Sequence, residues 1–492
     1  MSGESRPRSV VTLPRRLTFD PDDTPQRAAA SADIVRPPMS ASSQRRSVRP
    51  FRWFTPALAF ILLGYLFFSR SFAYVHIPGT PVFIGEIVLA IGLIEAVRLR
   101  PPWLRIIARS PILKALACFM ALCGCRLIVD LPTYGLDALR DSSIWYYGTY
   151  AFLVTVAIIY DPSFTVRMFQ WYRRAIPWFF LWTPFAVVLY EVDALSSITI
   201  PDSSTPINAF RAGDYAVHVA VAIAFTWLGV NRLAGDPPRP RAELALGVMA
   251  MMTLLMAGSQ NRGGLAAAML LMAIVMFYLP TGRRRRIILP VTASLLVVLA
   301  VVLLLDVRIP GQRRDVSVQQ VAENITSVVD SNDEELSGTI EYREKLWGQI
   351  VDDLFGSRRW LTGLGFGIII PEQYHGTDDD PNPLRSAHNS HLTVFTRTGL
   401  PGGILWVLLW TAWTVHLIRF IRRRPGRLRD PSAAMAAWLL GSSAAFMVNA
   451  FFDPALEGPH AGIWLFTLVG FGTAHTIYQR PTCQPHVTMG SA

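Results

Sequence analysis

Long apolar stretches alternate with polar segments along most of the chain, a pattern typical of helices that cross a membrane. A helix needs about 20 apolar residues to span roughly 30 Å of hydrocarbon. Stretches of about 16 to 20 residues lie near 53–69, 82–97, 112–129, 144–160, 176–191, 215–230, 243–257, 263–279, 287–305, 392–418, 433–452 and 460–478. We therefore expect an all-α, polytopic integral membrane protein with about twelve transmembrane helices.

The polar segments divide the chain into five regions. Residues 1–52 are rich in Arg, Pro, Ser and Asp, and we expect a disordered tail because they offer little apolar surface to bury. Nine helices follow over 53–305, and three more occupy 392–478 before a short tail at 479–492. Between them, 306–391 forms one long polar loop, in which we expect helices near 315–329 and 339–355.

The distribution of arginine predicts the orientation of these segments. Cytoplasmic loops retain positive charge during insertion. Alternate connecting segments are strongly basic, namely those at 98–109, 167–174, 232–241, 283–286 and 419–429. The opposite set carries about one arginine each, and the segment at 453–459 carries none. We therefore expect both termini to be cytoplasmic and the 306–391 loop to be extracytoplasmic.

Composition agrees with a membrane location and argues against other classes. The chain is 51% hydrophobic and 16% charged, with a mean hydropathy of +0.33. Its formal charge of +11 lies mostly in the basic loops and the N-terminal tail, where the anionic inner leaflet is a sufficient partner. We expect contact with membrane lipids and no nucleic-acid binding, since no aromatic residues interleave with the basic ones.

Two short outward turns carry arginines beside glycines. Arg211 lies in Arg-Ala-Gly-Asp-Tyr, and Arg262 lies in Gly-Ser-Gln-Asn-Arg-Gly-Gly. A helix that begins just after Arg262, with glycines allowing close approach, directs backbone N–H groups and a guanidinium towards one anion. The alternatives are an interfacial arginine at Arg211 and a polar turn that caps the next helix at Arg262.

The long loop holds the remaining candidates. Arg343 and Trp347 are four residues apart and share a helix face, either as a phosphate- and sugar-binding pair or as part of a solvated helix. The glycines of 363–367 indicate a turn, because no strand-helix unit surrounds them. At the membrane boundary, His388 can titrate near neutral pH and accept a proton. Asn389 could orient it or bind a sugar hydroxyl.

The combined pattern resembles the O-antigen ligase and O-antigen polymerase superfamily of bacterial membrane glycosyltransferases. The resemblance covers about 205–405. His-Asn-Ser-His-Leu at 388–392, followed by Thr-Gly-Leu-Pro-Gly-Gly at 398–403, is similar to the family's His-Asn-x-x-Leu segment and its later Gly-x-x-Gly. Arg262-Gly263 resembles its Ser-Arg-Gly turn with Asn261 in place of Ser, and Arg343 with Trp347 resembles its Arg-x-x-x-Trp helix. Arg211 and Gly213 resemble its Arg-x-x-Gly turn with shorter spacing.

The resemblance implies a glycosyltransferase that takes a polyprenyl-diphosphate-linked glycan and transfers it to a glycan or lipid acceptor. Arg211, Arg262 and Arg343 would hold the diphosphate, because guanidinium binds phosphate oxygens in pairs. His388 would be the general base, with Asn389, Trp347 and His391 supporting the site or binding sugar. The reaction would invert the anomeric carbon in the bacterial inner membrane, with a flippase and a chain-length regulator as partners. Ligase and polymerase share this donor and differ in the acceptor.

Two alternatives remain. The acidic runs at 333–335 and 378–380 could bind a divalent ion, but carboxylates in a polar loop are usually solvated, so we expect no metal and no other cofactor. A multi-pass transporter of a polar or anionic solute is the competing class. Transporters place polar groups near the bilayer midplane, whereas here the distinctive groups gather at one face.

Overall fold

The computed structural model describes residues 50–235, 240–304, 317, 319–320, 334–375, 385–424 and 430–478, which form helices and no β-strand. The first half contains α1 (Phe54–Ala73), α2 (Ile84–Leu99), α3 (Trp103–Arg109), α4 (Pro111–Tyr134), α5 (Leu136–Asp141), α6 (Ser143–Tyr146), α7 (Thr149–Tyr160), α8 (Ser163–Glu191), α9 (Ala212–Trp227) and η2 (Val230–Ala234). The second contains α10 (Pro240–Gln260), α11 (Arg262–Tyr278), α12 (Thr281–Leu304), α14 (Glu334–Gly356), α15 (Arg359–Thr362), α16 (Ile370–His375), α17 (Ser390–Arg422), α18 (Pro431–Phe452), η3 (Ala455–Glu457) and α19 (Pro459–Tyr478).

The all-α prediction is confirmed for these residues. Each predicted apolar stretch overlaps a helix, although α8 begins at Ser163, well before the stretch near 176–191, and the stretch near 144–160 is divided between α6 and α7. Six described segments are long and apolar enough to cross a membrane: Phe54–Ala73, Pro111–Tyr134, Ser143–Tyr160, Arg241–Gln260, Ser390–Arg422 and Pro431–Phe452. The total of about twelve spans stays a prediction.

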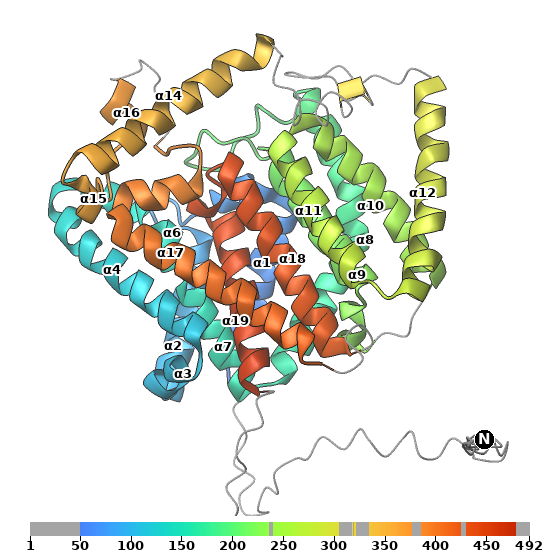
Figure 1. Cartoon of the computed structure of the whole chain (residues 1–492), viewed down its shortest axis with the longest axis horizontal. Helices are drawn as coiled ribbons and strands as arrows, with labels where there is room; N and C mark the ends of the chain where they lie inside the picture. The colour runs from blue at the N-terminus through green and yellow to red at the C-terminus, as the bar shows by residue number, and fades with distance from the viewer. Residues whose placement is uncertain are drawn as a thin grey trace, which may run out of the picture. The chain divides into compact units, whose positions relative to one another are not determined.

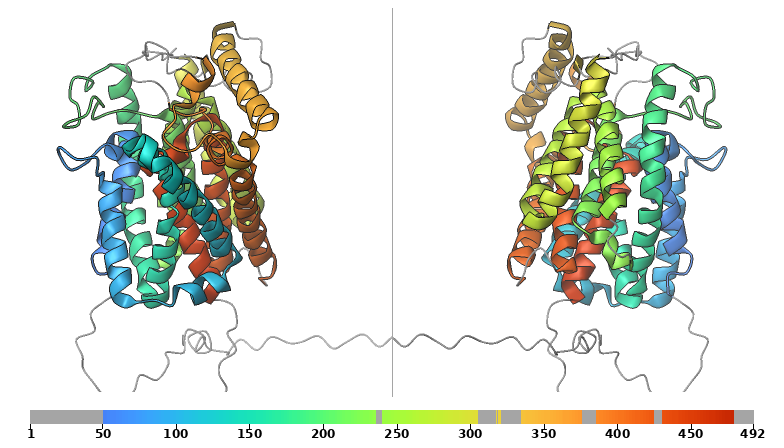
Figure 2. Two further views of the ribbon diagram at one scale, coloured as in Figure 1. Left: turned by 90° about the vertical axis from the view of Figure 1, so that its left-hand side faces the viewer. Right: turned by 90° about the vertical axis from the view of Figure 1, so that its right-hand side faces the viewer.

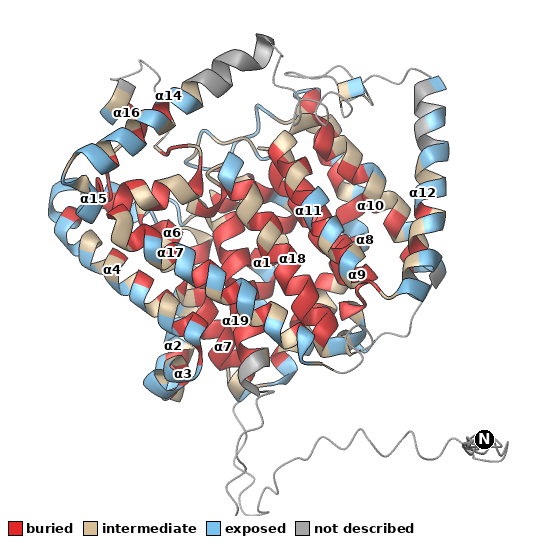
Figure 3. Cartoon of the chain, in the orientation of Figure 1, coloured by how far each residue is buried: buried red, intermediate tan, exposed pale blue. Residues whose placement is uncertain are grey.

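Helix α9 lies inside the bundle, in contact with α10, α11 and α18 (Figure 1). Every residue from Gly213 to Trp227 is buried, as expected for a helix that is apolar on all sides. Aromatic rings pack around this helix: the ring centroids of Phe225 and Trp438 are 5.3 Å apart, and those of Tyr172 and Trp464 are 5.5 Å apart. Figure 3 shows the contrast with α3 and α12, whose surfaces are largely exposed. The N-terminus of α9, with Arg211 as its N-cap, is thus held by packing along the whole helix.

Helices α14 and α16 lie at one end of the bundle and α3 lies at the other (Figures 1 and 2). The predicted helix near 339–355 is confirmed as part of α14, whereas the one near 315–329 lies largely outside the described residues. Leu346, Ile350 and Leu354 of α14 recur every four residues and are buried against Leu364, Ile370 and Ala387. This small cluster holds α14 against the two segments that lead to α17.

Helix α17 contains a kink at Gly399, where φ is 67°. A Cβ atom at Gly399 would lie 2.6 Å from the Trp360 carbonyl oxygen, so only glycine permits this approach. Gly363 packs against the same kink: a Cβ atom added there would lie 2.5 Å from the Arg397 carbonyl carbon. The expected turn at 363–367 is confirmed: Gly363, Gly365 and Gly367 all have positive φ.

Candidate active site

The C-terminal end of α18 brings two of the predicted arginines together. Arg211 Nη1 lies 3.4 Å from Asp453 Oδ2. Arg343, from the exposed end of the molecule, donates from Nη1 to the Phe452 carbonyl oxygen at 3.3 Å. Residues more than 100 positions apart in the sequence therefore share a contact point at Phe452 and Asp453.

The turn that carries Arg262 packs directly beside this point. Asn261 caps α11 by accepting a hydrogen bond from the Gly264 N–H at 2.7 Å. A Cβ atom at Gly264 would lie 2.5 Å from the Gly213 Cα atom, and one at Gly263 would lie 2.6 Å from the Phe452 Cβ atom. The glycines thus bring the N-termini of α9 and α11 to the end of α18. That an anion binds at this turn stays a prediction.

His388 stands between α14 and the start of α17. Its φ of 54° is in the left-handed region, which is uncommon for a residue with a side chain. Burial, and then the positive charge of Arg343, lower the pKa of His388 to about 4. The imidazole is therefore neutral at pH 7, below the near-neutral titration expected from the sequence. This effect also places His388 within electrostatic reach of Arg343.

Residues on both sides fix the backbone of His388. Trp347 donates from Nε1 to the Ala387 carbonyl oxygen at 2.8 Å, and its ring packs 5.7 Å from Phe451. Asn389 caps α17, because its side-chain oxygen accepts from the N–H groups of His391 and Leu392 at 3.0 and 3.1 Å. Both were predicted to support the site or bind sugar. In the structure their polar groups position the segment that carries His388.

His391 faces the protein interior rather than the arginines. Its Nδ1 accepts from Trp406 Nε1 at 3.1 Å, and its Nε2 lies 2.8 Å from the Met447 carbonyl oxygen. Since indole N–H only donates and a carbonyl only accepts, these contacts assign the neutral Nε2–H tautomer. Both ring nitrogens are used between α17 and α18, so His391 serves packing.

A buried acidic group next to Arg211 escaped the sequence reasoning. Asp214 accepts from Ser69 Oγ at 3.1 Å and from Asn449 Nδ2 at 3.0 Å, and it lies 3.2 Å from His460 Nε2. These partners come from α1, α18 and the start of α19. Asp214 thereby ties three helices to the N-terminus of α9. The only signal in the sequence is an aspartate three residues after Arg211.

Asp453 was also missed. It follows the last residue of α18, and its backbone N–H donates to the Asn449 carbonyl oxygen at 3.0 Å. Burial and the charge of Asp214 raise the pKa of Asp453 to about 7, although His460, Arg70 and Arg343 act in the opposite direction. The site therefore combines arginines with an acid that titrates near neutral pH.

Residues 247–407 match the protein-family model described as O-Antigen ligase. The chain carries an O-antigen ligase-like domain. This confirms the resemblance seen in the sequence motifs, and it supports a membrane glycan ligase or polymerase with lipid-linked glycan substrates, in a multi-pass protein of the bacterial inner membrane. A comparison with curated proteins finds no match. Arg262, Arg343 and His388 lie within the O-antigen ligase-like domain, whereas Arg211 and Asp453 lie outside the matched residues.

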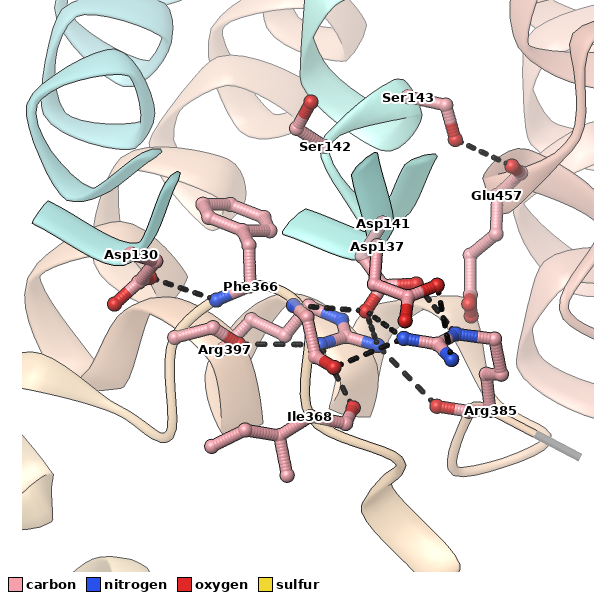
Figure 4. A network of polar contacts seen from close by, with 12 residues as sticks. Asp130, Asp137, Asp141, Ser142, Ser143, Phe366, Ile368, Arg385, Arg397 and Glu457 are labelled. Atoms are coloured by element: carbon pink, nitrogen blue, oxygen red, sulfur yellow. Dashed lines mark hydrogen bonds and ion pairs between the residues drawn. The ribbon is translucent and has the colours of Figure 1, made fainter. Parts of the chain in front are cut away.

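A polar network anchors the part of the O-antigen ligase-like domain that precedes His388 (Figure 4). Arg397 is fully buried and donates to the carbonyl oxygens of Gly365, Ile368 and Arg385 at 3.1 to 3.3 Å. Asp141 of α5 forms ion pairs with both arginines: its Oδ2 lies 2.9 Å from Arg397 Nη2, and its Oδ1 lies 3.1 Å from Arg385 Nε. The network fixes both ends of the segment between the glycine turn and α17, and so positions His388 without touching it.

No group of three or more His, Cys, Asp or Glu side chains is placed to hold a metal ion among the residues that the structure describes. The acidic run at 378–380 lies outside them, as does Asp333, the first residue of the other run.

Proposed function

We propose that the chain transfers or polymerises glycans from a polyprenyl-diphosphate-linked donor, on the extracytoplasmic face and without a metal ion. The observation that carries this proposal is the convergence of Arg211, Arg343 and the Arg262 turn on the end of α18, with His388 within electrostatic reach of Arg343. Guanidinium groups bind phosphate oxygens and stabilise the charge that develops as the anomeric C–O bond breaks.

In this mechanism His388 accepts the proton of the acceptor hydroxyl as that oxygen attacks the anomeric carbon. Attack from the side opposite the diphosphate inverts the configuration. Burial and the positive charge of Arg343 hold the pKa of His388 at about 4, which makes it a weak base. A diphosphate bound at Arg343 supplies negative charge next to the imidazole, and this raises the proton affinity of His388 when the donor is in place.

The family match and the end of the molecule at which the cluster lies favour this reaction over transport of a polar solute. Arg211, the Arg262 turn and Asp453 meet at the ends of α9, α11 and α18. Transporters usually bind their solutes near the middle of the membrane instead. The acceptor, a lipid anchor or a growing glycan, separates ligase from polymerase. A flippase and a chain-length regulator are the partners we expect for a polymerase.

Cells that lack the gene test this proposal. The lipid-linked glycan should accumulate in them, and expression of the wild-type chain should convert it into polymer or ligated product. A chain with Arg211→Gln, Arg343→Gln or His388→Ala should be present in the membrane at the wild-type level and leave the donor unconverted. Uptake or export of a solute without consumption of the lipid-linked donor would instead identify a transporter.

A further inference from the structure

The carboxylate of Asp453 lies at the position where the proposed site would receive an anion. It is fixed from the backbone side, because its N–H donates to the Asn449 carbonyl oxygen and its own carbonyl oxygen accepts from Ser390 Oγ at 3.4 Å. Its side chain meets Arg211 at 3.4 Å, a long ion pair in which the Arg211 side chain remains 37% exposed and the Asp453 side chain 20% exposed. An incoming anion can therefore reach both partners.

Two other acids, Asp214 and Glu457, lie among the charged groups around Asp453. The titratable and charged groups that face it come from several elements: Arg211 at the N-cap of α9, Asp214 of α9, Arg70 of α1, Arg343 of α14, Glu457 of η3 and His460 of α19. Asp214 is buried and held by Ser69, Asn449 and His460, so it stays beside Asp453. A bound diphosphate would place further negative charge against the same carboxylate.

We propose that Asp453 holds the place of the donor's diphosphate in the free protein, and that it takes up one proton when the diphosphate displaces it from Arg211. The identity of the anion rests on the function proposed above. The proton comes from water, and no covalent bond other than the O–H bond forms or breaks. Like charges in contact disfavour double ionisation, so the neutral acid is the form compatible with a bound diphosphate. The protonated carboxyl can then donate a hydrogen bond to a diphosphate oxygen.

This exchange has a thermodynamic consequence. If binding is linked to proton uptake, the affinity for a diphosphate must fall as pH rises. With a pKa of about 7 in the free protein, roughly nine-tenths of Asp453 is ionised at about pH 8. An alkyl diphosphate is itself almost fully ionised there. Net uptake at that pH should therefore approach about 0.9 proton per bound diphosphate when Asp453 becomes fully protonated.

Isothermal titration calorimetry of the whole chain in lipid nanodiscs tests this inference. Farnesyl diphosphate is the probe, and the titration is repeated at about pH 8 in buffers of different ionisation enthalpy, which reveals the number of protons exchanged. The wild-type chain should bind with net proton uptake. Asp453→Asn should bind at least as tightly with uptake close to zero, because its amide cannot titrate. His388→Asn is the matched control, since it removes the other nearby group that could accept a proton, and it should retain the uptake.

The outcomes separate the two proposals. Binding without proton uptake by the wild-type chain, or uptake that persists in Asp453→Asn, would overturn the exchange at Asp453 and leave the donor assignment intact. Absence of farnesyl diphosphate binding would overturn the donor assignment, and the exchange would fall with it. If the variant misfolds, a measurement on the wild-type chain alone still tests the exchange. Its Kd for farnesyl diphosphate should rise several-fold for each pH unit between about pH 7.5 and 8.5. A Kd that stays constant or falls over this range would contradict the exchange.

Discussion

Two substitutions at His388 separate the catalytic role of its imidazole from the backbone strain at this position. Its φ of 54° strains any residue that has a Cβ atom, by about 1–2 kcal/mol. The described residues include no hydrogen-bond partner for its imidazole, since the contact from Ser386 involves the His388 backbone N–H. We therefore compare His388→Ala, which keeps the strain, with His388→Gly, which relieves it. Both variants lack the proposed base.

The expected difference in stability follows from two opposing effects. Glycine at this position recovers the strain of about 1–2 kcal/mol but costs about 0.5–1 kcal/mol in added freedom of the unfolded chain. Relief of strain outweighs this cost, so His388→Gly should be more stable than His388→Ala by about 0.5–1 kcal/mol. Both variants should transfer glycan about 10²- to 10⁴-fold more slowly than the wild type, the usual scale of general-base catalysis.

Equilibrium unfolding in mixed micelles and a transfer assay normalised to folded protein would measure the two effects. Glycine usually makes a protein less stable than alanine does. Here we expect the glycine variant to be the more stable of the two and equally inactive. A glycine variant that is less stable than the alanine variant would show that the backbone at His388 is not strained. Full transfer activity in either variant would remove His388 from the chemistry, whatever the stabilities.

Three further predictions concern other parts of the site. Arg262→Lys should be strongly impaired with little change in folding, because an ammonium cannot reproduce a bidentate diphosphate contact; normal product from a normally expressed variant would exclude Arg262. His391→Ala should lose about 1–3 kcal/mol of stability, because the Trp406 N–H loses its partner. Its transfer rate per folded molecule should stay within several-fold of the wild type. A loss of rate as large as that of His388→Ala would contradict the packing role of His391. In a cysteine-free background, Arg358→Cys should react with an impermeant thiol reagent in intact cells and Arg285→Cys should not; the reverse would overturn the predicted topology.

The helices could be predicted because apolar length alone specifies a spanning helix. The short surface helices α3, α5, α15 and α16 could not, since they depend on packing rather than on length. The kink in α17 follows from the approach of Trp360 and Gly363 to Gly399, which the local sequence indicates only as a glycine two residues before Pro401.

The site was predictable to the extent that its chemistry lies in one kind of residue. Arginines beside glycines identified Arg211 and Arg262, and the four-residue spacing from Trp347 identified Arg343. Asp453 could not be found in this way, because its partner Arg211 is 242 residues away and a lone aspartate after a helix carries no signal. His388 and His391 are three residues apart and look alike in sequence. Only the contacts of His391 with Trp406 and Met447 show which of the two is locked into the packing.

Glycan transfer by the purified chain tests the central claim most directly. The protein in nanodiscs would receive a polyprenyl-diphosphate-linked glycan and an acceptor, with a metal chelator present, and released polyprenyl diphosphate and extended acceptor would be counted together. The account predicts that the wild type forms the two products in equal amounts, unaffected by the chelator, and that His388→Ala and Arg343→Gln form neither at a comparable rate. A wild-type chain that leaves the donor intact, or that needs a divalent cation to cleave it, would contradict the account.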